Sequence, residues 1–170
     1  MTTSELLLLD FDSEISNTRR TIERLTDNLG DYAPHEKSMK LGKLAMHCAS
    51  LPLFGLYIME DEAMDMAKST RPQPDFTWTN TAAALERLDD SAARCRAAIA
   101  SASDDHLAKD WKFTFGEHLI SNHSRSKSFR LMCFDHLIHH TAQLGVYLRL
   151  NNLAVPALYG PSADEPWAPR

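Results

Sequence analysis

The chain has 170 residues, of which 44% are hydrophobic and 24% are charged. A chain of this length is too short for two ordinary domains, so residues 1–170 are expected to form one domain with a single buried core. The net charge of -5, with no basic run, argues against a nucleic-acid partner, because DNA and RNA are bound by clustered positive side chains.

The sequence has neither the pattern of a membrane segment nor that of a secretory leader. The apolar run Leu6–Leu9 is far shorter than the roughly 20 residues that a membrane-spanning helix needs. The first residues lack the basic start, apolar middle and small-residue cleavage site of a signal peptide. We therefore expect a soluble, cytoplasmic protein with no membrane contact.

The first helix is predicted near the N-terminus. Thr2 and Glu5 have the spacing of a capping box, in which each side chain hydrogen-bonds the backbone N–H of the other residue. Apolar residues then recur at steps of three and four, which predicts a helix over residues 4–29 that Gly30 ends. Residues 31–37 have turn composition and predict a loop.

The second helix is predicted over residues 39–67 and carries a histidine among its apolar residues. Its inward stripe follows steps of three and four, through Leu44, His47, Leu51, Phe54 and Ile58. His47 is therefore expected to point into the core. Pro52 lies inside this helix and removes one backbone hydrogen bond, which predicts a disturbed turn just after His47.

A polar connection with two prolines, residues 68–75, predicts an exposed crossover to a third helix. That helix is expected to begin at Thr77 or Thr79 and to end at about Ala100. Further along, Trp111, Phe113 and Phe115 alternate with polar residues before Gly116, which predicts a short strand-like or hairpin insertion over residues 111–120.

Three cysteines, Cys48, Cys95 and Cys133, lie in three different predicted helices. They form no C-x-x-C pair, so neither a disulfide framework nor a cysteine metal site is expected. We predict that they are small buried side chains in the core.

The fourth helix is predicted from about Ser124 to Asn151. Four long amphipathic helices with one small insertion before the last predict an all-α protein, a four-helix bundle. The tail, residues 152–170, holds four of the eight prolines, so it is expected to lie along the bundle as an extended cover.

The fourth helix also carries three histidines, which suggest a metal site. His136 and His140 are four residues apart, so on a helix their side chains stand one above the other and can reach one ion. His139 points elsewhere and is the weaker candidate. A divalent ion such as zinc takes at least three protein ligands, and facing inner stripes of a bundle meet, so His47 is predicted to complete the site.

These histidines also have a structural interpretation. His136 and His140 can be hydrogen-bonded polar residues at the edge of a buried face, without any metal. A single inward histidine such as His47 is more often a core residue whose ring nitrogens are satisfied by neighbours.

Four further polar residues have two interpretations each. Gln143 and Tyr147 lie near the histidine stripe, where they would either orient a metal ligand or join two helices by hydrogen bonds. His118 and His123 lie between the insertion and the last helix, where they would either line a pocket or be solvated.

Three stretches together resemble one known family. They are SMKLGKLAMHCASLP, HLIHHTAQLGVYLRL and VPALYGPSADE, and they resemble the DinB-like family, the DinB/YfiT-like metalloenzymes. The resemblance implies an up-down-down-up bundle with a long crossover, often a homodimer, and a nickel or zinc site. The family's site combines one histidine of the second helix with an H-x-x-x-H pair of the last, and the matching residues here are His47, His136 and His140.

One position departs from the family pattern. The commonest family motif has arginine after the last ligand, as in HHRGQL, whereas this chain has Thr141 and Ala142 before Gln143. A role carried by that arginine is therefore not transferred to this chain.

The resemblance also implies a function. Related enzymes include thiol-dependent S-transferases, a mycothiol-dependent isomerase and metal-dependent hydrolases, so we predict a metal-dependent enzyme of the thiol S-transferase or small-hydrolase type. Its substrate would be a small molecule, such as a low-molecular-weight thiol. The alternative is a non-catalytic metal-binding or small-molecule-binding bundle with a stress-related role. No Glu follows His47 as in H-E-x-x-H, which disfavours peptide hydrolysis.

Overall fold

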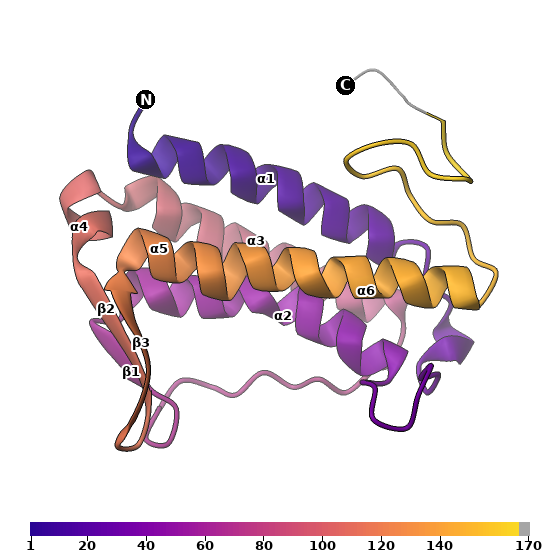
Figure 1. Ribbon diagram of the computed structural model, residues 1–170, viewed down its shortest axis with the longest axis horizontal. Coiled ribbons are helices and arrows are strands. Elements are labelled where there is room, and N and C mark those ends of the chain that lie inside the picture. Colours follow the sequence, from indigo (N-terminus) through magenta and orange to yellow (C-terminus); the bar gives the residue numbers. More distant parts are fainter. Residues whose placement is uncertain (167–170) are drawn as a thin grey trace.

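The computed structural model describes residues 1–166. It is mostly helical, as predicted, and four long helical segments lie side by side (Figure 1). Their bounds are Thr3–Ile22 for α1, Leu41–Glu60 for α2, Thr81–Ser101 for α3, and, for the last segment, Arg125–Phe129 (α5), a π-helical turn over Arg130–Asp135, and His136–Leu150 (α6). In Figure 1, α1 and α6 run from left to right, whereas α2 and α3 run in the opposite direction.

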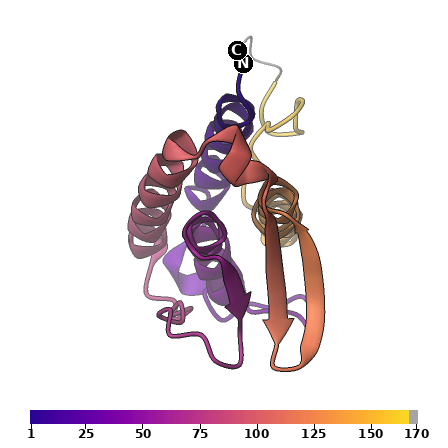
Figure 2. The same cartoon turned by 90° about the vertical axis from the view of Figure 1, so that its left-hand side faces the viewer.

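A small mixed sheet lies at one end of the helices (Figure 2). Its strands are β1 (Ala63–Asp65), β2 (Asp110–Phe115) and β3 (His118–Ser124), in that order. The antiparallel β2–β3 hairpin, which turns at Gly116 with φ of +57°, confirms the insertion predicted over residues 111–120. The expected all-α class is thus confirmed only in its mostly helical character, because β1 pairs in parallel with β2 and completes a three-stranded sheet that the sequence did not predict.

The first helix begins as predicted and ends earlier than predicted. The Thr2–Glu5 capping box is present, but α1 stops at Ile22, before the expected end at Leu29 and Gly30. The backbone carbonyls beyond Ile22 are used by the segment that leads into α3. Thr81 Oγ1 donates to the carbonyl of Leu25 at 3.2 Å, and Trp78 Nε1 donates to that of Asp27 at 3.2 Å. Tertiary hydrogen bonds thus replace the helical ones, and only a short 3-10 helix follows, Asp27–Leu29.

The second helix is shorter than the predicted residues 39–67. Arg125 is fully buried and donates from Nη1 to the backbone carbonyl of Asp61 at 2.7 Å and to that of Ile58, so it satisfies acceptors at the end of α2. The chain then turns into β1, whose pairing with β2 replaces further helical hydrogen bonds.

The core surrounds α2, which lies between α1, α3 and α6 (Figure 2). Nearly all residues of α2 are buried. This one helix is long and apolar enough to cross a membrane by length and composition, which the short run Leu6–Leu9 did not indicate. However, 83% of its apolar window is buried inside the protein, and a buried core helix passes the same test.

The three cysteines are free and buried in the core, as predicted. Two of them lie closer together than their separation in sequence indicated. A Cβ atom added to Gly55 would lie 2.9 Å from Cys133 Sγ and 3.0 Å from Cys95 Sγ, so both thiols fill the space that this glycine leaves.

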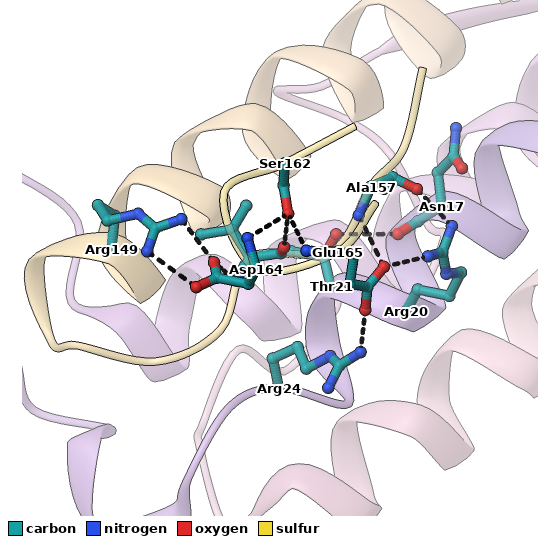
Figure 3. A network of polar contacts seen from close by, with 10 residues as sticks. Asn17, Arg20, Thr21, Arg24, Arg149, Ala157, Ser162, Asp164 and Glu165 are labelled. Carbon is teal, nitrogen blue, oxygen red and sulfur yellow. Dashed lines mark hydrogen bonds and ion pairs between the residues drawn. The ribbon is translucent and has the colours of Figure 1, made fainter. Parts of the chain in front are cut away.

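The tail crosses α1 and α6 without forming a helix or strand up to residue 166. Asn152 ends α6 with φ of +58°. Two carboxylates then fasten the tail (Figure 3): Glu165 accepts from Arg20 Nη2 at 2.7 Å, and Asp164 accepts from Arg149 Nη2 at 2.5 Å. Arg24 also pairs with Glu165. The predicted extended cover is therefore present over residues 152–166, and its last four residues lie outside the described part.

Candidate metal centre

Helices α2 and α6 run in opposite directions and bring three histidines together. His47 Nε2 lies 3.3 Å from His136 Nε2. The ring centroids of His47 and His140 are 4.6 Å apart, and those of His136 and His140 are 4.7 Å apart. One ligand nitrogen from each ring lies within 4.8 Å of the other two. The structure therefore places all three predicted residues in one cluster.

The spacing of this cluster fits a divalent ion. Two nitrogen ligands at about 2.0–2.1 Å from a tetrahedral zinc ion are roughly 3.3 Å apart, which matches the distance between His47 Nε2 and His136 Nε2. All three rings are partly exposed, so the cluster is reachable from outside. Three imidazoles leave at least one coordination position for another ligand, the arrangement typical of catalytic zinc sites.

Hydrogen bonds fix two of the three rings. His140 Nδ1 lies 2.7 Å from Gln143 Oε1, an acceptor, so Nδ1 carries the proton and the lone pair is on Nε2. The ring of His136 hydrogen-bonds the backbone of Met132, which lies in the π-helical turn just before it. π-helical turns are frequent at functional sites. Both contacts orient a ring nitrogen toward His47.

The protein keeps these imidazoles neutral. Burial, followed by the neighbouring rings of His140 and His136 and the charge of Lys43, lowers the pKa of His47 to about 4. The pKa values of His136 and His140 are also below the ordinary value, mainly because of burial. Neutral imidazole is the form that binds metal, so the cluster is prepared for an ion at neutral pH.

No carboxylate is among the groups that shift these pKa values. Besides the three rings themselves, the charged neighbours that act on them are Lys43 and His139. The groups that act on the described rings are therefore neutral or positive. A bound divalent ion would keep its full charge there.

Of the other polar residues that the sequence singled out, Gln143 contacts the histidine cluster and Tyr147 joins two segments. Gln143 orients His140, whereas the hydroxyl of Tyr147 donates to the backbone carbonyl of Met39 at 2.9 Å and so joins α6 to the segment before α2. His139 and His118 are exposed, and His123 is partly exposed on β3, opposite Trp111.

The site of the family's arginine is used for packing in this chain. Thr141 is buried, and its Oγ1 lies 2.9 Å from Thr18 Oγ1 on α1. It also hydrogen-bonds Cys48 on α2. The side chain of Thr141 therefore faces α1 and α2 in the core and not the histidine cluster.

Two neighbours of the cluster were not predicted from the sequence. The ring of Phe76 meets that of His47 edge to face, with centroids 5.3 Å apart. Phe76 lies in the crossover, which has no periodicity that would have indicated an inward residue. Lys43 lies one helical turn before His47 in an otherwise apolar stretch, and that spacing was a usable signal.

Two clefts of the described surface lie away from the cluster. One of about 740 Å³ is lined by the end of α2, the second half of α3 and His106. Another of about 380 Å³ lies between α1, α6 and the tail. Neither includes a cluster histidine. A metal ion is bound by converging ligand atoms and does not need a large cavity.

The sequence pattern of the DinB superfamily matches residues 10–144. The chain belongs to this superfamily. The match spans both α2 and the histidine pair of α6, so the DinB-like resemblance of the sequence is confirmed.

Solved structures of DinB-like proteins share the fold of this chain. A DinB-like protein from Bacillus subtilis superposes with a TM-score of 0.67 at 18% identity, over 89% of this chain and 96% of that one. A DinB-like protein from Bacillus cereus ATCC 10987 gives 0.64 at 17% identity, over 89% and 95%. A candidate DinB family member from Exiguobacterium sibiricum 255-15 gives 0.63 at 19% identity, over 89% and 93%. No curated protein sequence matches the chain.

Proposed function

We propose that His47, His136 and His140 bind one divalent metal ion, nickel or zinc, and that the protein is a metal-dependent enzyme of the thiol S-transferase type. The observation that carries this proposal is the convergence of three neutral imidazoles from two helices, with ligand atoms within 4.8 Å of one another. Membership of the DinB superfamily supports it.

The surroundings of the cluster favour transfer of a bound nucleophile over hydrolysis. A general base within hydrogen-bond reach of the attacking water assists a metal hydrolase, and no carboxylate is among the groups that shift the pKa values of the three rings. A thiol is acidic enough to need less help, because its ordinary pKa is about 8.5. A small hydrolase is thus the weaker alternative.

A divalent ion held by three neutral imidazoles would supply a full positive charge that attracts an anionic ligand and acidifies it. The residues of the chain have distinct tasks around it. Gln143 fixes the tautomer of His140, and Phe76 shields one side of His47 from water. Lys43 adds positive charge on the open side.

A second candidate function is a binding protein without turnover. The same lack of a carboxylate near the cluster favours it, since a stable metal-binding or small-molecule-binding bundle needs no general base. The two functions differ in whether a thiol held at the metal reacts with an added electrophile. Incubating the metal-loaded protein with a thiol and 1-chloro-2,4-dinitrobenzene, and following thioether formation, separates them.

We further infer that the four long helical segments form a DinB-type four-helix bundle in a single cytoplasmic domain, and that two chains associate as a homodimer. The up-down-down-up course of the helices and the superfamily match support the bundle. The dimer rests on the resemblance alone. Light scattering that gives a monomer across the micromolar range would contradict it.

The metal site is tested by removing one ligand at a time. Because each histidine supplies a third of the protein ligands, His47→Ala, His136→Ala and His140→Ala are each expected to abolish tight binding of nickel and zinc. Elemental analysis and competition with a chelator measure the effect, on proteins shown to be folded by circular dichroism. His139→Ala and His123→Ala are controls and should retain the metal. Equal metal content in the parent and in the ligand variants would refute the proposal.

A further inference from the structure

Helix α2 is covered by other elements along almost its whole surface. All of its residues are buried except four, which are Lys43, His47, Phe54 and Glu60. Glu60 is the last residue of the helix. The central helix of the protein therefore reaches the surface at three interior positions, and one of them is a metal-ligand candidate.

These three positions lie on one line. At 100° per residue, Lys43, His47 and Phe54 fall within an arc of about 40°. With a rise of 1.5 Å per residue, Lys43 lies about 6 Å from His47 along the helix axis, and Phe54 lies about 10 Å away in the other direction. We call this stripe the α2 window. It presents a cation, an imidazole and an aromatic ring in that order.

The cation of the window has no partner. Lys43 makes no ion pair or hydrogen bond with any other residue of the described part, residues 1–166, although many arginines and lysines of the chain are paired with carboxylates. Examples are Lys40 with Asp31 and Arg96 with Asp12. An unpaired ammonium group beside the cluster favours an anionic group of a ligand.

The aromatic end of the window is rigid. Phe54 packs edge to face against Phe113, with centroids 5.4 Å apart, and against Trp111, at 6.2 Å. The inner face of the sheet thus holds the ring in place while part of it stays exposed. Between Phe54 and His47 lies Ser50, whose Oγ is buried and has no hydrogen-bond partner in the described residues. The window therefore offers an apolar surface on this side of the cluster, with a buried hydroxyl that has no partner in the described residues beneath it.

We propose that the α2 window determines which ligand the metal centre accepts, with Lys43 selecting a negatively charged group and Phe54 selecting an apolar or aromatic group on the opposite side of the metal-binding atom. The ligand class is thus a small amphipathic organic anion. This inference rests on the proposed metal site. It assigns specificity to two residues that do not coordinate the ion.

Binding of simple thiols to the nickel-loaded protein tests the two ends separately. The probes are 2-mercaptoethanol, which is small and neutral, 3-mercaptopropionate, which adds a carboxylate, and 2-phenylethanethiol, which adds an aromatic ring. Sulfur-to-nickel charge-transfer absorbance gives the dissociation constant of each. Lys43→Gln should weaken 3-mercaptopropionate by about twofold to fivefold, the range of an exposed ion pair, and less at high salt. It should leave the other two probes unchanged.

The aromatic end has its own variant. Phe54→Leu keeps an apolar side chain in the core contact and should weaken 2-phenylethanethiol by about threefold, because aromatic pairs contribute beyond their buried area. Lys40→Gln is the matched control for charge, since Lys40 is close in sequence but paired with Asp31. It should have no effect on any probe, and Lys43→Arg should retain the preference for the carboxylate.

The outcomes separate this inference from the proposed function. If the parent binds nickel and thiols but the variants change all three probes equally, or none, the window does not select ligands and the inference is wrong while the metal site stands. If the parent binds neither nickel nor zinc, both are wrong. Selective loss of one probe in each variant supports the inference.

Discussion

The two sides of α6 differ in whether their polar groups form ion pairs. The side facing α2 carries His136, His140 and Gln143, whose contacts involve no ion pair. The side facing the tail carries Arg149, which pairs with Asp164. Beside it, Glu165 gathers two arginines of α1 (Figure 3).

On the tail side of α6 the polar groups fasten the tail to the helices, whereas on the α2 side they form the proposed metal site. On the tail side, each carboxylate is satisfied by arginines and backbone N–H groups, which lower the pKa values of Asp164 and Glu165. On the α2 side, ring nitrogens face one another and Lys43 is unpaired. Both sides thus hold groups with shifted pKa values, but only the α2 side combines them with an unpaired cation and ring nitrogens that face one another, which is why the proposed site lies there.

The sharpest test of this difference after ligand removal is Gln143→Ala. The side chain contacts His140 but not the ion, so its loss should free the ring without removing a ligand. Loss of such an orienting group typically weakens metal affinity about tenfold to a hundredfold. Chelator competition would measure this, with Gln73→Ala in the exposed crossover as a control. An unchanged affinity would mean that Gln143 only caps the ring in the absence of metal.

The second test uses pH. An imidazole with a pKa of 6.5 is about nine-tenths protonated at pH 5.5, but His47, with a pKa of about 4, stays neutral there. Metal affinity should therefore persist below pH 6. With ligands that have the pKa of free imidazole, metal affinity would fall about tenfold per ligand at pH 5.5. Isothermal titration from pH 7 to 5 would show it, and a tenfold loss per histidine by pH 5.5 would contradict it.

The lowered pKa of His47 also makes the stability of the metal-free protein depend on pH. Between pH 6.5 and 4 the unfolded chain binds a proton at His47 that the folded chain does not. The free energy of unfolding should therefore fall as the pH is lowered from 6.5 to 4. Urea unfolding at several pH values would measure this for the parent and for His47→Gln. The free energy of unfolding should fall less with pH in the variant, and an equal fall in both proteins would exclude His47 as its source.

The smallest effect is expected on the tail side. Glu165→Gln removes the charge that Arg20 and Arg24 share, and because these groups are largely solvated, the free energy of unfolding should fall by at most about 1 kcal/mol. Sodium chloride should reduce the difference. Metal content should not change. Glu36→Gln, on an exposed residue, is the control, and a loss of metal in Glu165→Gln would show that the two sides of α6 are coupled.

Local sequence signals predicted much of this structure. The capping box at Thr2, the start of the last helical segment near Ser124 and the insertion around Gly116 each depend on neighbouring residues alone, and all are present. The convergence of His136 and His140 followed from helical spacing. Their meeting with His47 came from the bundle geometry and the family resemblance together.

The errors arose where distant segments compete for the backbone. The ends of α1 and α2 were predicted too late, because Thr81 and Arg125 take carbonyls that a longer helix would use. Strand β1 has three residues and depends on parallel pairing with β2, so no pattern within it was available. Phe76 reaches His47 from a segment without periodicity.

The π-helical turn Arg130–Asp135 has a consequence for how the length of this chain can vary. Buried residues of the last helical segment recur at steps of four across it, through Arg125, Phe129, Cys133, Leu137 and Thr141. An α-helix turns every 3.6 residues, so the wider turn absorbs the excess and keeps His136 facing α2. Deleting one residue inside the turn would convert it to an ordinary α-helical turn and leave the histidines in phase. The same deletion between His136 and His140 would move His140 from about 40° on one side of His136 to about 60° on the other side, and it would turn the packed residues after it by about 100° around the helix. A one-residue deletion should therefore disturb the site less in the π-helical turn than between the two histidines.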